Sequence, residues 1–257
     1  MRIGQVGGTN FTSGSGTVIS PQHVLTAKHV GGTRFWMRDD GQNISGFVDS
    51  ISRLNHSVAD LAILEFAPNT FSDWYRPIYA DQIGTTATMV GFGLTANLRA
   101  NGTGYNVVNN SGSIRRWTVN VADNRRSVNL GGGITDSVSL EYDLDGAPGA
   151  PGDRNTYGSG DPISGEGGIL SGDSGGAWLV PQGPTWGLIG VNSFILDVDG
   201  VGGGLNNFLD WGDGGGAVDV NEYSSWIETN APIPEPASLA ILSLGIAALA
   251  LRRRRRK

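Results

Sequence analysis

The sequence predicts an all-β protein, a barrel or a sandwich of short strands that ends in one short helix. Glycine accounts for 41 of the 257 residues and follows no collagen-like period, so we interpret the glycines as turns between strands. Strand-like apolar runs are interrupted at short intervals by Gly, Pro, Asn and Asp, as at 16–19, 23–27, 34–37 and 61–66. One helix is indicated at 220–227, where apolar residues recur at nearly helical spacing.

The chain divides into three predicted regions. Residues 1–80 contain the four runs above. Residues 81–230 contain the helix and five further strand candidates, separated by glycine- and asparagine-rich stretches that we expect to be loops. These candidates are 87–90, 114–121, 137–142, 177–180 and 187–191, and the main loops are 97–112 and 144–168. Residues 231–257 form a tail of different composition.

The tail begins with a proline-rich stretch, which excludes helix and central strand. An apolar run at 237–251 follows, and the chain ends in five arginines and a lysine. As a helix the run would extend roughly 22 Å at about 1.5 Å per residue, against a hydrocarbon core of about 30 Å. Snorkelling arginines would close this gap and would lie on the cytoplasmic side. We therefore expect a single apolar helix that contacts the membrane.

Composition excludes several classes of function. The formal net charge is −6, and six of the 18 basic residues lie at the extreme C-terminus, so the body is strongly acidic. Nucleic acid is not expected as a partner, because phosphate binding needs clustered Lys and Arg. The absence of cysteine excludes disulfides, zinc–thiolate sites and a cysteine nucleophile. The first residues lack the apolar core of a secretory signal.

The most informative motif is Gly-Asp-Ser-Gly-Gly at 172–176, which precedes an apolar strand candidate. A serine between glycines on a tight turn exposes its hydroxyl and directs backbone N–H groups at one point, where they stabilise an oxyanion. The motif resembles the nucleophile segment of the trypsin/chymotrypsin family of serine endopeptidases. The resemblance implies that Ser174 attacks the scissile carbonyl and that the N–H groups of Gly172 and Ser174 form the oxyanion hole.

A serine nucleophile needs a base, and the chain has three histidines, His23, His29 and His56. His29 ends Leu-Thr-Ala-Lys-His at 25–29, which resembles the family's Leu-Thr-Ala-Ala-His with Lys28 in place of an alanine. His23 follows a proline in a turn, and His56 lies in a loop without a motif. The resemblance implies that His29 is the general base.

Asp60 opens the apolar run Asp-Leu-Ala-Ile-Leu, which resembles the family's Asp-Ile-Ala-Leu-Leu. An unpaired buried carboxylate is costly, so an aspartate at the start of a core strand is expected to have a partner. The order His29, Asp60, Ser174 matches the family and differs from subtilisin and the α/β-hydrolases. Three other aspartates lack the flanking pattern: Asp39, Asp40 and Asp49.

The resemblance covers most of residues 14–230 and implies a specific architecture. It predicts two antiparallel β-barrels of six strands each, with His29 and Asp60 in residues 1–80 and Ser174 in residues 81–230. The active site would lie in the cleft between them. The implied reaction is hydrolysis of a protein or peptide substrate through an acyl-enzyme, without metal or cofactor.

Four positions resemble the family's substrate-binding segments. Trypsin has an aspartate six positions before its nucleophile, at the base of the specificity pocket, and this chain has Gly168 there, so a preference for Arg or Lys is not supported. Ser193 and Phe194 resemble the strand that lies beside the substrate backbone. Ile195 stands where many members keep glycine, and its branched side chain is expected to narrow the pocket and favour small residues.

Activation in the family requires a newly freed N-terminal amine that pairs with the aspartate before the nucleophile, here Asp173. Met1 lies too close to the first strand to leave an obvious propeptide. We therefore expect the true start to lie upstream and to carry a signal peptide. The alternative is that Asp173 is held in another way.

Pro234-Glu235-Pro236, the apolar run and the arginine cluster resemble the PEP-CTERM sorting signal of Gram-negative bacteria. The resemblance implies export, transient anchoring in the inner membrane through 237–251, and removal of the tail by an exosortase-like enzyme. The protein would then reside at the cell surface or outside the cell. The alternative is an ordinary short membrane anchor.

Two other functions were compatible with parts of the sequence. A catalytically silent protease-fold protein, acting in binding or in the extracellular matrix, would fit display at the cell surface, but all three triad residues are present. An esterase of the α/β-hydrolase fold needs a histidine after its serine, and none follows Ser174. The sequence therefore favours a serine endopeptidase.

Overall fold

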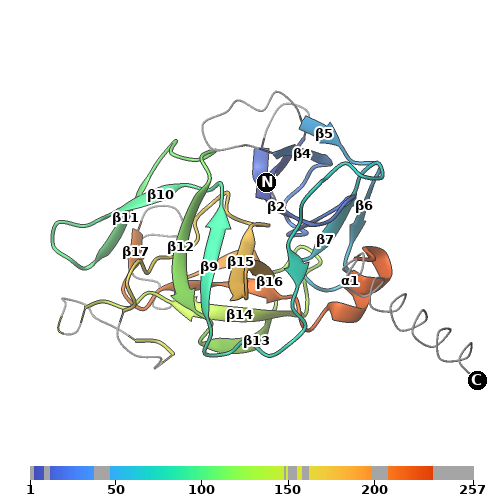
Figure 1. Ribbon diagram of the computed structural model, residues 1–257. Helices are drawn as coiled ribbons and strands as arrows, with labels where there is room; N and C mark the ends of the chain where they lie inside the picture. Colours follow the sequence, from blue (N-terminus) through green and yellow to red (C-terminus); the bar gives the residue numbers. More distant parts are fainter. Residues whose placement is uncertain are drawn as a thin grey trace, which may run out of the picture.

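The computed structural model describes residues 3–8, 12–37, 47–147, 149, 155–157, 162–197 and 208–233. Strands predominate in these ranges and a single helix lies near their end. Figure 1 shows the blue N-terminal strands gathered at the upper right, beside a larger group of strands that runs from green to orange. The all-β fold class expected from the sequence is therefore confirmed.

The first sheet has seven antiparallel strands in the order β5-β4-β1-β2-β3-β7-β6. Its core contains Phe35, Phe66 and Phe71, whose rings pack edge to face or tilted at 5.2–6.1 Å between centroids. The strands are β1 (Ile3–Gly7), β2 (Thr12–Ser20), β3 (His23–Thr26), β4 (Arg34–Met37), β5 (Phe47–Asp49), β6 (Ser52–Asn55) and β7 (Ala62–Glu65).

The second sheet has eight strands, seven of them in the antiparallel order β12-β9-β15-β16-β18-β14-β13. The short strand β8 pairs with β16 in parallel. Among the described residues the two large sheets have seven and eight strands, where the sequence predicted six in each barrel. The strands are β8 (Arg76–Pro77), β9 (Thr86–Gly91), β12 (Arg116–Val121), β13 (Asn124–Val128), β14 (Ser137–Asp143), β15 (Ala177–Gln182), β16 (Thr185–Leu196) and β18 (Gly214–Asp219).

A third, small sheet corrects one sequence prediction. Residues 97–112 were expected to be a loop, but β10 (Thr95–Leu98) and β11 (Gly104–Val108) form a hairpin, and β17 (Phe208–Asp210) pairs with it. The sequence did not predict these strands because their apolar residues alternate only weakly. Polar contacts stabilise the hairpin instead. The Arg99 guanidinium binds the Asp210 carboxylate and the backbone carbonyl of Tyr105.

The helix α1 (Ser224–Asn230) begins four residues later than the periodicity predicted, because residues 220–223 form a turn. It buries Ile227 completely. Figure 1 shows α1 beside β6 and β7 of the first sheet. The ring of His56 packs against Tyr223 and Trp226 there, with centroid distances of 4.9 and 5.1 Å. The helix therefore supports the loop that leads to Asp60.

One apolar cluster joins the two sheets. It includes Ile19 and Leu25 from the first sheet and Leu179 and Val191 from the second, each at most 3% exposed. Because such interiors pack at crystal-like density, this shared cluster fixes the two sheets relative to each other. Side chains at their junction are held in place by both.

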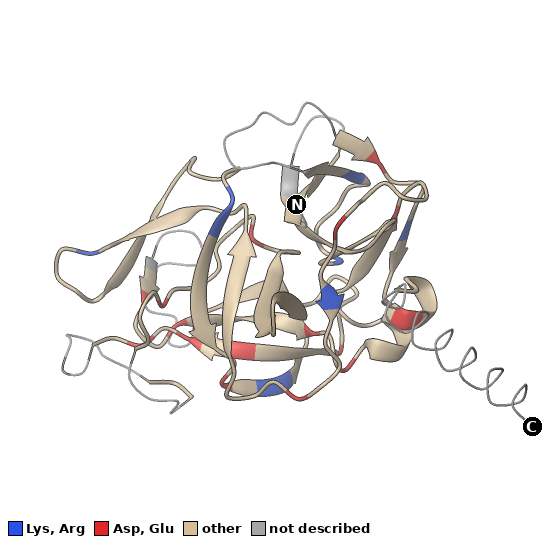
Figure 2. Cartoon of the chain, in the orientation of Figure 1, with Lys and Arg blue, Asp and Glu red and all other residues tan. Residues whose placement is uncertain are grey.

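The predicted apolar run at 237–251 lies outside the described residues. Within the described residues, no helix combines the length and apolarity that crossing a membrane requires. Figure 2 shows Lys and Arg distributed over strands of both large sheets.

Candidate active site

His29 and Asp60 lie at the same edge of the first sheet. Thr26, the last residue of β3, pairs with Ala62, the first residue of β7. His29 follows β3 in a turn and Asp60 immediately precedes β7, so the register brings the two together. The sequence prediction that Asp60 has a partner is met by this pairing.

Two hydrogen bonds connect the pair. The backbone N–H of His29 donates to Oδ1 of Asp60 at 2.9 Å, and Nδ1 of the imidazole lies 2.7 Å from Oδ2. The carboxylate is fully buried, whereas the histidine side chain is 40% exposed. An ionised carboxylate only accepts, so Nδ1 of His29 carries the proton of this hydrogen bond.

The Asp60 carboxyl stays ionised despite its burial. Desolvation alone would raise its pKa, but hydrogen bonds from the His29 ring, the charge of that ring and the Ser193 hydroxyl outweigh this and hold the pKa below its ordinary value. The carboxylate therefore places a buried negative charge behind the imidazole.

Ser193 reaches Asp60 because β16 contains a bulge. Asn192 pairs with Ala217 and Phe194 with Gly216, so Ser193 is an extra residue without a partner on β18. Its hydroxyl donates to Oδ2 of Asp60, and the side chain is buried. Bulges re-aim side chains in this way next to functional sites. The sequence placed Ser193 beside the substrate, and its contact with the aspartate was not predicted.

The segment around Ser174 is held by bonds from both sheets. The Ser15 N–H donates to the carbonyl of Ser174 at 2.7 Å, and the Ser15 hydroxyl donates to the carbonyl of Gly172 at 2.9 Å. Gly175 has φ +86°, and a Cβ there would lie 2.1 Å from the carbonyl oxygen of Ser15. Only glycine fits this conformation and this contact.

Asn192 provides a second support that sequence reasoning missed. Its carbonyl accepts from Gly175 N–H at 2.7 Å, and its amide Nδ2 donates to the carbonyls of Asp173 and Val90 at 3.1 and 3.3 Å. No local pattern marks this residue. Its polarity inside an apolar strand is the one signal that could have suggested a role.

Two backbone N–H groups of the Gly-Asp-Ser-Gly-Gly segment at 172–176 are left available. Those of Asp173, Gly175 and Gly176 donate to backbone carbonyls. In the described part of the chain, the N–H groups of Gly172 and Ser174 have no such acceptor. Unsatisfied N–H groups in a well-ordered turn form a site for a negatively charged oxygen. These are the two groups that the sequence predicted as the oxyanion hole.

The side chain of Ser174 is half-buried in the loop at 172–176. Its position relative to His29 is set through Ser15, whose carbonyl accepts from the Thr26 hydroxyl at 2.7 Å just before the His29 turn. Within the described residues, the Ser174 hydroxyl makes no hydrogen bond to the imidazole. Such contacts are often long in free enzymes and shorten when substrate binds.

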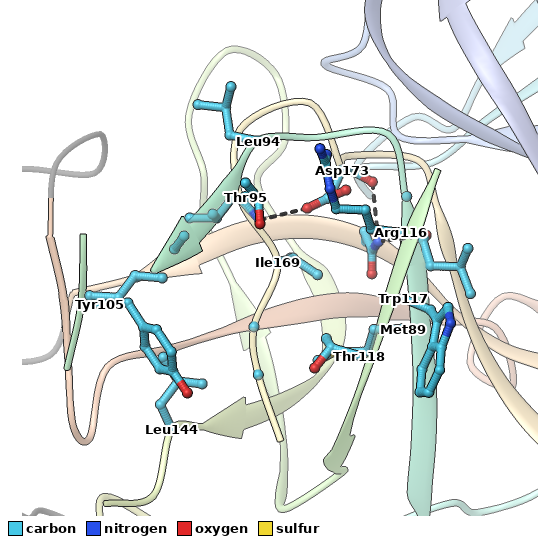
Figure 3. Close-up of a pocket in the computed structure, with 18 of the residues that line it drawn as sticks. Met89, Leu94, Thr95, Tyr105, Arg116, Trp117, Thr118, Leu144, Ile169 and Asp173 are labelled. Carbon is cyan, nitrogen blue, oxygen red and sulfur yellow. Dashed lines mark hydrogen bonds between the residues drawn. The ribbon is translucent and has the colours of Figure 1, made fainter. Parts of the chain in front are cut away.

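The Asp173 carboxylate is held by two backbone N–H groups of neighbouring segments. It accepts from the N–H groups of Gly93 at 2.7 Å and Leu170 at 2.8 Å. Burial raises its pKa to about 6, while these bonds and the nearby Arg116 charge pull the pKa down. Figure 3 shows Asp173 and Arg116 at one end of a cavity of about 210 Å³. The Arg116 guanidinium also donates to the carbonyl of Gly93 at 3.2 Å.

The four predicted substrate-binding residues separate into two groups. Ser193 and Phe194 line an open cavity of about 490 Å³ together with His29. Gly168 instead lines the cavity beside Asp173, and Ile195 packs against the core of the second sheet. The other residues of the open cavity are Lys28, Asn55, Leu130, Gly131, Gly132 and Ile134.

The family model of trypsin matches residues 4–227, which is most of the chain. The chain belongs to the trypsin family. A second family model, the PEP-CTERM protein-sorting motif, matches residues 232–256. A solved structure of HL collagenase has the same fold, with a TM-score of 0.58 and 18% sequence identity, and covers 91% of this chain and 94% of its own. No curated protein matches the chain.

The two-barrel, trypsin-like fold implied by the sequence is thereby confirmed. Ser174, His29 and Asp60, which the sequence predicted as nucleophile, base and orienting acid, lie on the loop, turn and sheet edge described above. Among the described residues, no group of three or more His, Asp or Glu side chains is arranged to hold a metal ion.

Proposed function

We propose that this trypsin-family protein is a serine endopeptidase in which Ser174 is the nucleophile, His29 the general base and Asp60 its orienting partner. The observation that carries the proposal is the free pair of N–H groups at Gly172 and Ser174. An oxyanion needs two such donors, and one donor of this kind contributes about 3 kcal/mol to the transition state.

The reaction follows from this arrangement. Ser174 Oγ forms a bond to the carbonyl carbon while its proton moves to His29 Nε2. The carbonyl π electrons move to oxygen, which the Gly172 and Ser174 N–H groups bind. Collapse breaks the C–N bond as His29 returns the proton to the leaving amine. Water then repeats the sequence on the acyl-enzyme and frees Ser174.

The sorting motif extends the proposal to location. We propose that residues 1–80 and 81–230 form the two halves of the catalytic unit and that residues 231–257 act as a removable address. Export would be followed by transient contact of 237–251 with the inner membrane and by cleavage by an exosortase-like enzyme. The mature protease would act on protein substrates at the cell surface or outside the cell of a Gram-negative bacterium. The match of the PEP-CTERM motif to 232–256 supports this route.

The proposed chemistry is tested with an alkyl fluorophosphonate, which phosphonylates activated serines and requires little substrate recognition. The full chain is treated, digested and analysed by mass spectrometry. We expect an adduct on Ser174 that is lost in Ser174→Ala and strongly reduced in His29→Ala. A folded protein that takes up no probe at Ser174 would be a catalytically silent member of the family.

A further inference from the structure

A substrate side chain would enter the space beside Ser174 between two chain segments. One segment, residues 168–170, leads into the nucleophile turn, because Asp173 N–H donates to the carbonyl of Leu170. The other segment, residues 193–195, begins at Ser193, whose hydroxyl is hydrogen-bonded to the Asp60 carboxylate. By the resemblance to the trypsin family, the side chain of the residue whose carbonyl is attacked, called P1, would lie between these two segments.

Both walls of this space carry glycine. Gly168 lies on the first segment, and Gly215 pairs with Ile195 on the strand behind the second. Glycine walls would leave a deep pocket for a large side chain. In this molecule the space between the two glycines is already occupied.

The occupant is Tyr142 from β14, which pairs with Gly215. A Cβ at Gly168 would lie 2.6 Å from the Tyr142 hydroxyl oxygen, and one at Gly215 would lie 2.9 Å from the same atom. The phenol therefore extends between the walls. The two glycines make room for this ring, which fills the depth that their missing side chains would otherwise leave open.

The ring cannot easily move aside. The Ile169 N–H donates to its hydroxyl at 2.7 Å, and the indole of Trp178 packs against it with 5.7 Å between ring centroids. Tyr142 is 1% exposed and Trp178 is fully buried. Displacing Tyr142 would break a buried hydrogen bond and reopen a close-packed core.

We propose that Tyr142 forms the floor of the P1 pocket and limits this protease to substrates with a small P1 residue, such as glycine, alanine or serine. The inference rests on the proposed serine endopeptidase function. The inference assigns the restriction of P1 size to Tyr142 on β14, the strand that pairs with Gly215 of β18. Ile195, which the sequence suggested for this role, packs into the core of the second sheet.

The full chain is tested with internally quenched peptides that differ only at P1, carrying Ala, Val, Leu, Phe or Arg. We expect kcat/KM for the alanine peptide to exceed that for leucine about 10-fold and those for phenylalanine and arginine about 100-fold, since a closed hydrophobic pocket discriminates by such factors. Efficient cleavage after phenylalanine or arginine by the wild-type chain would overturn the inference.

Two variants test whether the Tyr142 ring causes the preference for small P1 residues. Tyr142→Ala should raise kcat/KM for the leucine or phenylalanine peptide relative to alanine at least about 10-fold. Tyr142→Phe, which keeps the ring and loses the hydroxyl, should retain the wild-type preference. A folded Tyr142→Ala protein with the unchanged preference would overturn the assignment. If Tyr142→Ala fails to fold, the wild-type profile still tests the restriction to small P1 residues, and a preference for large P1 residues would overturn the inference.

Fluorophosphonate labelling in the same samples separates this inference from the function on which it rests. If Ser174 is labelled but the peptides with large P1 residues are cleaved best, the serine endopeptidase function is supported and the proposed role of Tyr142 is wrong. Absence of labelling in folded protein would remove both.

Discussion

The hydroxyl of Ser193 donates a hydrogen bond to the buried carboxylate that also holds His29. The bond exists because a bulge in β16 gives Ser193 no partner on β18. Asp60 thus receives three donors, the His29 ring, the His29 N–H and the Ser193 hydroxyl. This arrangement keeps a fully buried carboxylate ionised, and the tautomer of His29 depends on that charge.

Removing this donor should weaken catalysis. Ser193→Ala leaves Asp60 with two donors, so its pKa should rise and its hold on His29 should loosen. A hydrogen bond to a charged group contributes about 1.5–3 kcal/mol, so we expect kcat to fall roughly 10- to 100-fold with little change in KM. Ser139→Ala, which alters another buried serine, serves as control. Equal kcat in Ser193→Ala and wild type would show that the contact has no catalytic role.

Lys28 occupies the position where the family pattern has alanine, and its side chain makes two hydrogen bonds to backbone carbonyls. Its ammonium donates to the carbonyl of Gly133 at 2.8 Å and to that of Ser57 at 3.2 Å. Residues 131–133 all have positive φ, and part of this turn lines the open cavity beside His29. Lys28 therefore ties a glycine turn of the second barrel to the first.

Lys28→Met should release this turn. We expect KM for a peptide that spans the cavity to rise about 3- to 10-fold, in line with the loss of one or two charge-assisted bonds. Turnover of a small acyl ester that does not reach the turn should change less than about twofold. Lys28→Arg, which keeps a cation, should lie closer to wild type. A KM unaffected by Lys28→Met would mean that the tie does not shape the cavity.

The pKa of Asp173 predicts a pH dependence of stability. It is raised to about 6, against roughly 4 in an unfolded chain. The folded protein therefore holds an extra proton between these values, and the contribution of Asp173 to stability falls as pH rises from about 4 to about 6. Arg116 limits this loss because its charge favours the ionised carboxyl.

Arg116→Met should therefore destabilise the protein in a pH-dependent way. Its unfolding free energy should fall below that of wild type by roughly 0.5–1 kcal/mol more at pH 8 than at pH 4, because the lost attraction acts on the ionised form. Arg116→Lys should restore much of the difference. Urea titrations at both pH values measure it, and a gap that does not change with pH would refute the electrostatic role.

Two glycines with similar φ should respond differently to alanine. Gly175 has φ +86° and no room for a Cβ, whereas Gly183 has φ +59° in open space. Gly183→Ala should cost about 1 kcal/mol of backbone strain, and Gly175→Ala more than about 3 kcal/mol because Ser15 would also have to move. Urea unfolding compares them. Equal losses would indicate that the contact with Ser15 relaxes freely.

Much of the fold could be predicted because its strands have apolar runs. Segments 23–27 and 177–180 coincide with β3 and β15. By contrast, β18 begins with three glycines and is recognised only by its pairing with β14 and β16 on either side. Strand β13 is polar, and Arg125 and Arg126 hold it through Asp219 and Glu141. Such strands depend on residues far away in the chain and leave no local pattern.

The same distinction applies to the site. His29, Asp60 and Ser174 lie in contiguous motifs, so their residue types and flanking strands identify them. Ser15, Asn192 and Tyr142 act through contacts with residues many positions away, and only the folded chain brings these partners together. The sequence predicted that Ser193 lies near the substrate. Its hydrogen bond to Asp60 depends on a bulge in β16, and the alternation of residues along a strand does not reveal a bulge.

Ser174 and His29 should act as one catalytic unit, and a double-mutant kinetic cycle tests this most directly. The measurement is kcat/KM for an alanine-P1 peptide in Ser174→Ala, His29→Ala and the double variant. We predict that each single variant loses about 10⁴-fold or more and that the double variant is no worse than Ser174→Ala, because residues that act as a unit are not additive. Activity of Ser174→Ala within about 10-fold of wild type, or losses that multiply in the double variant, would contradict the account.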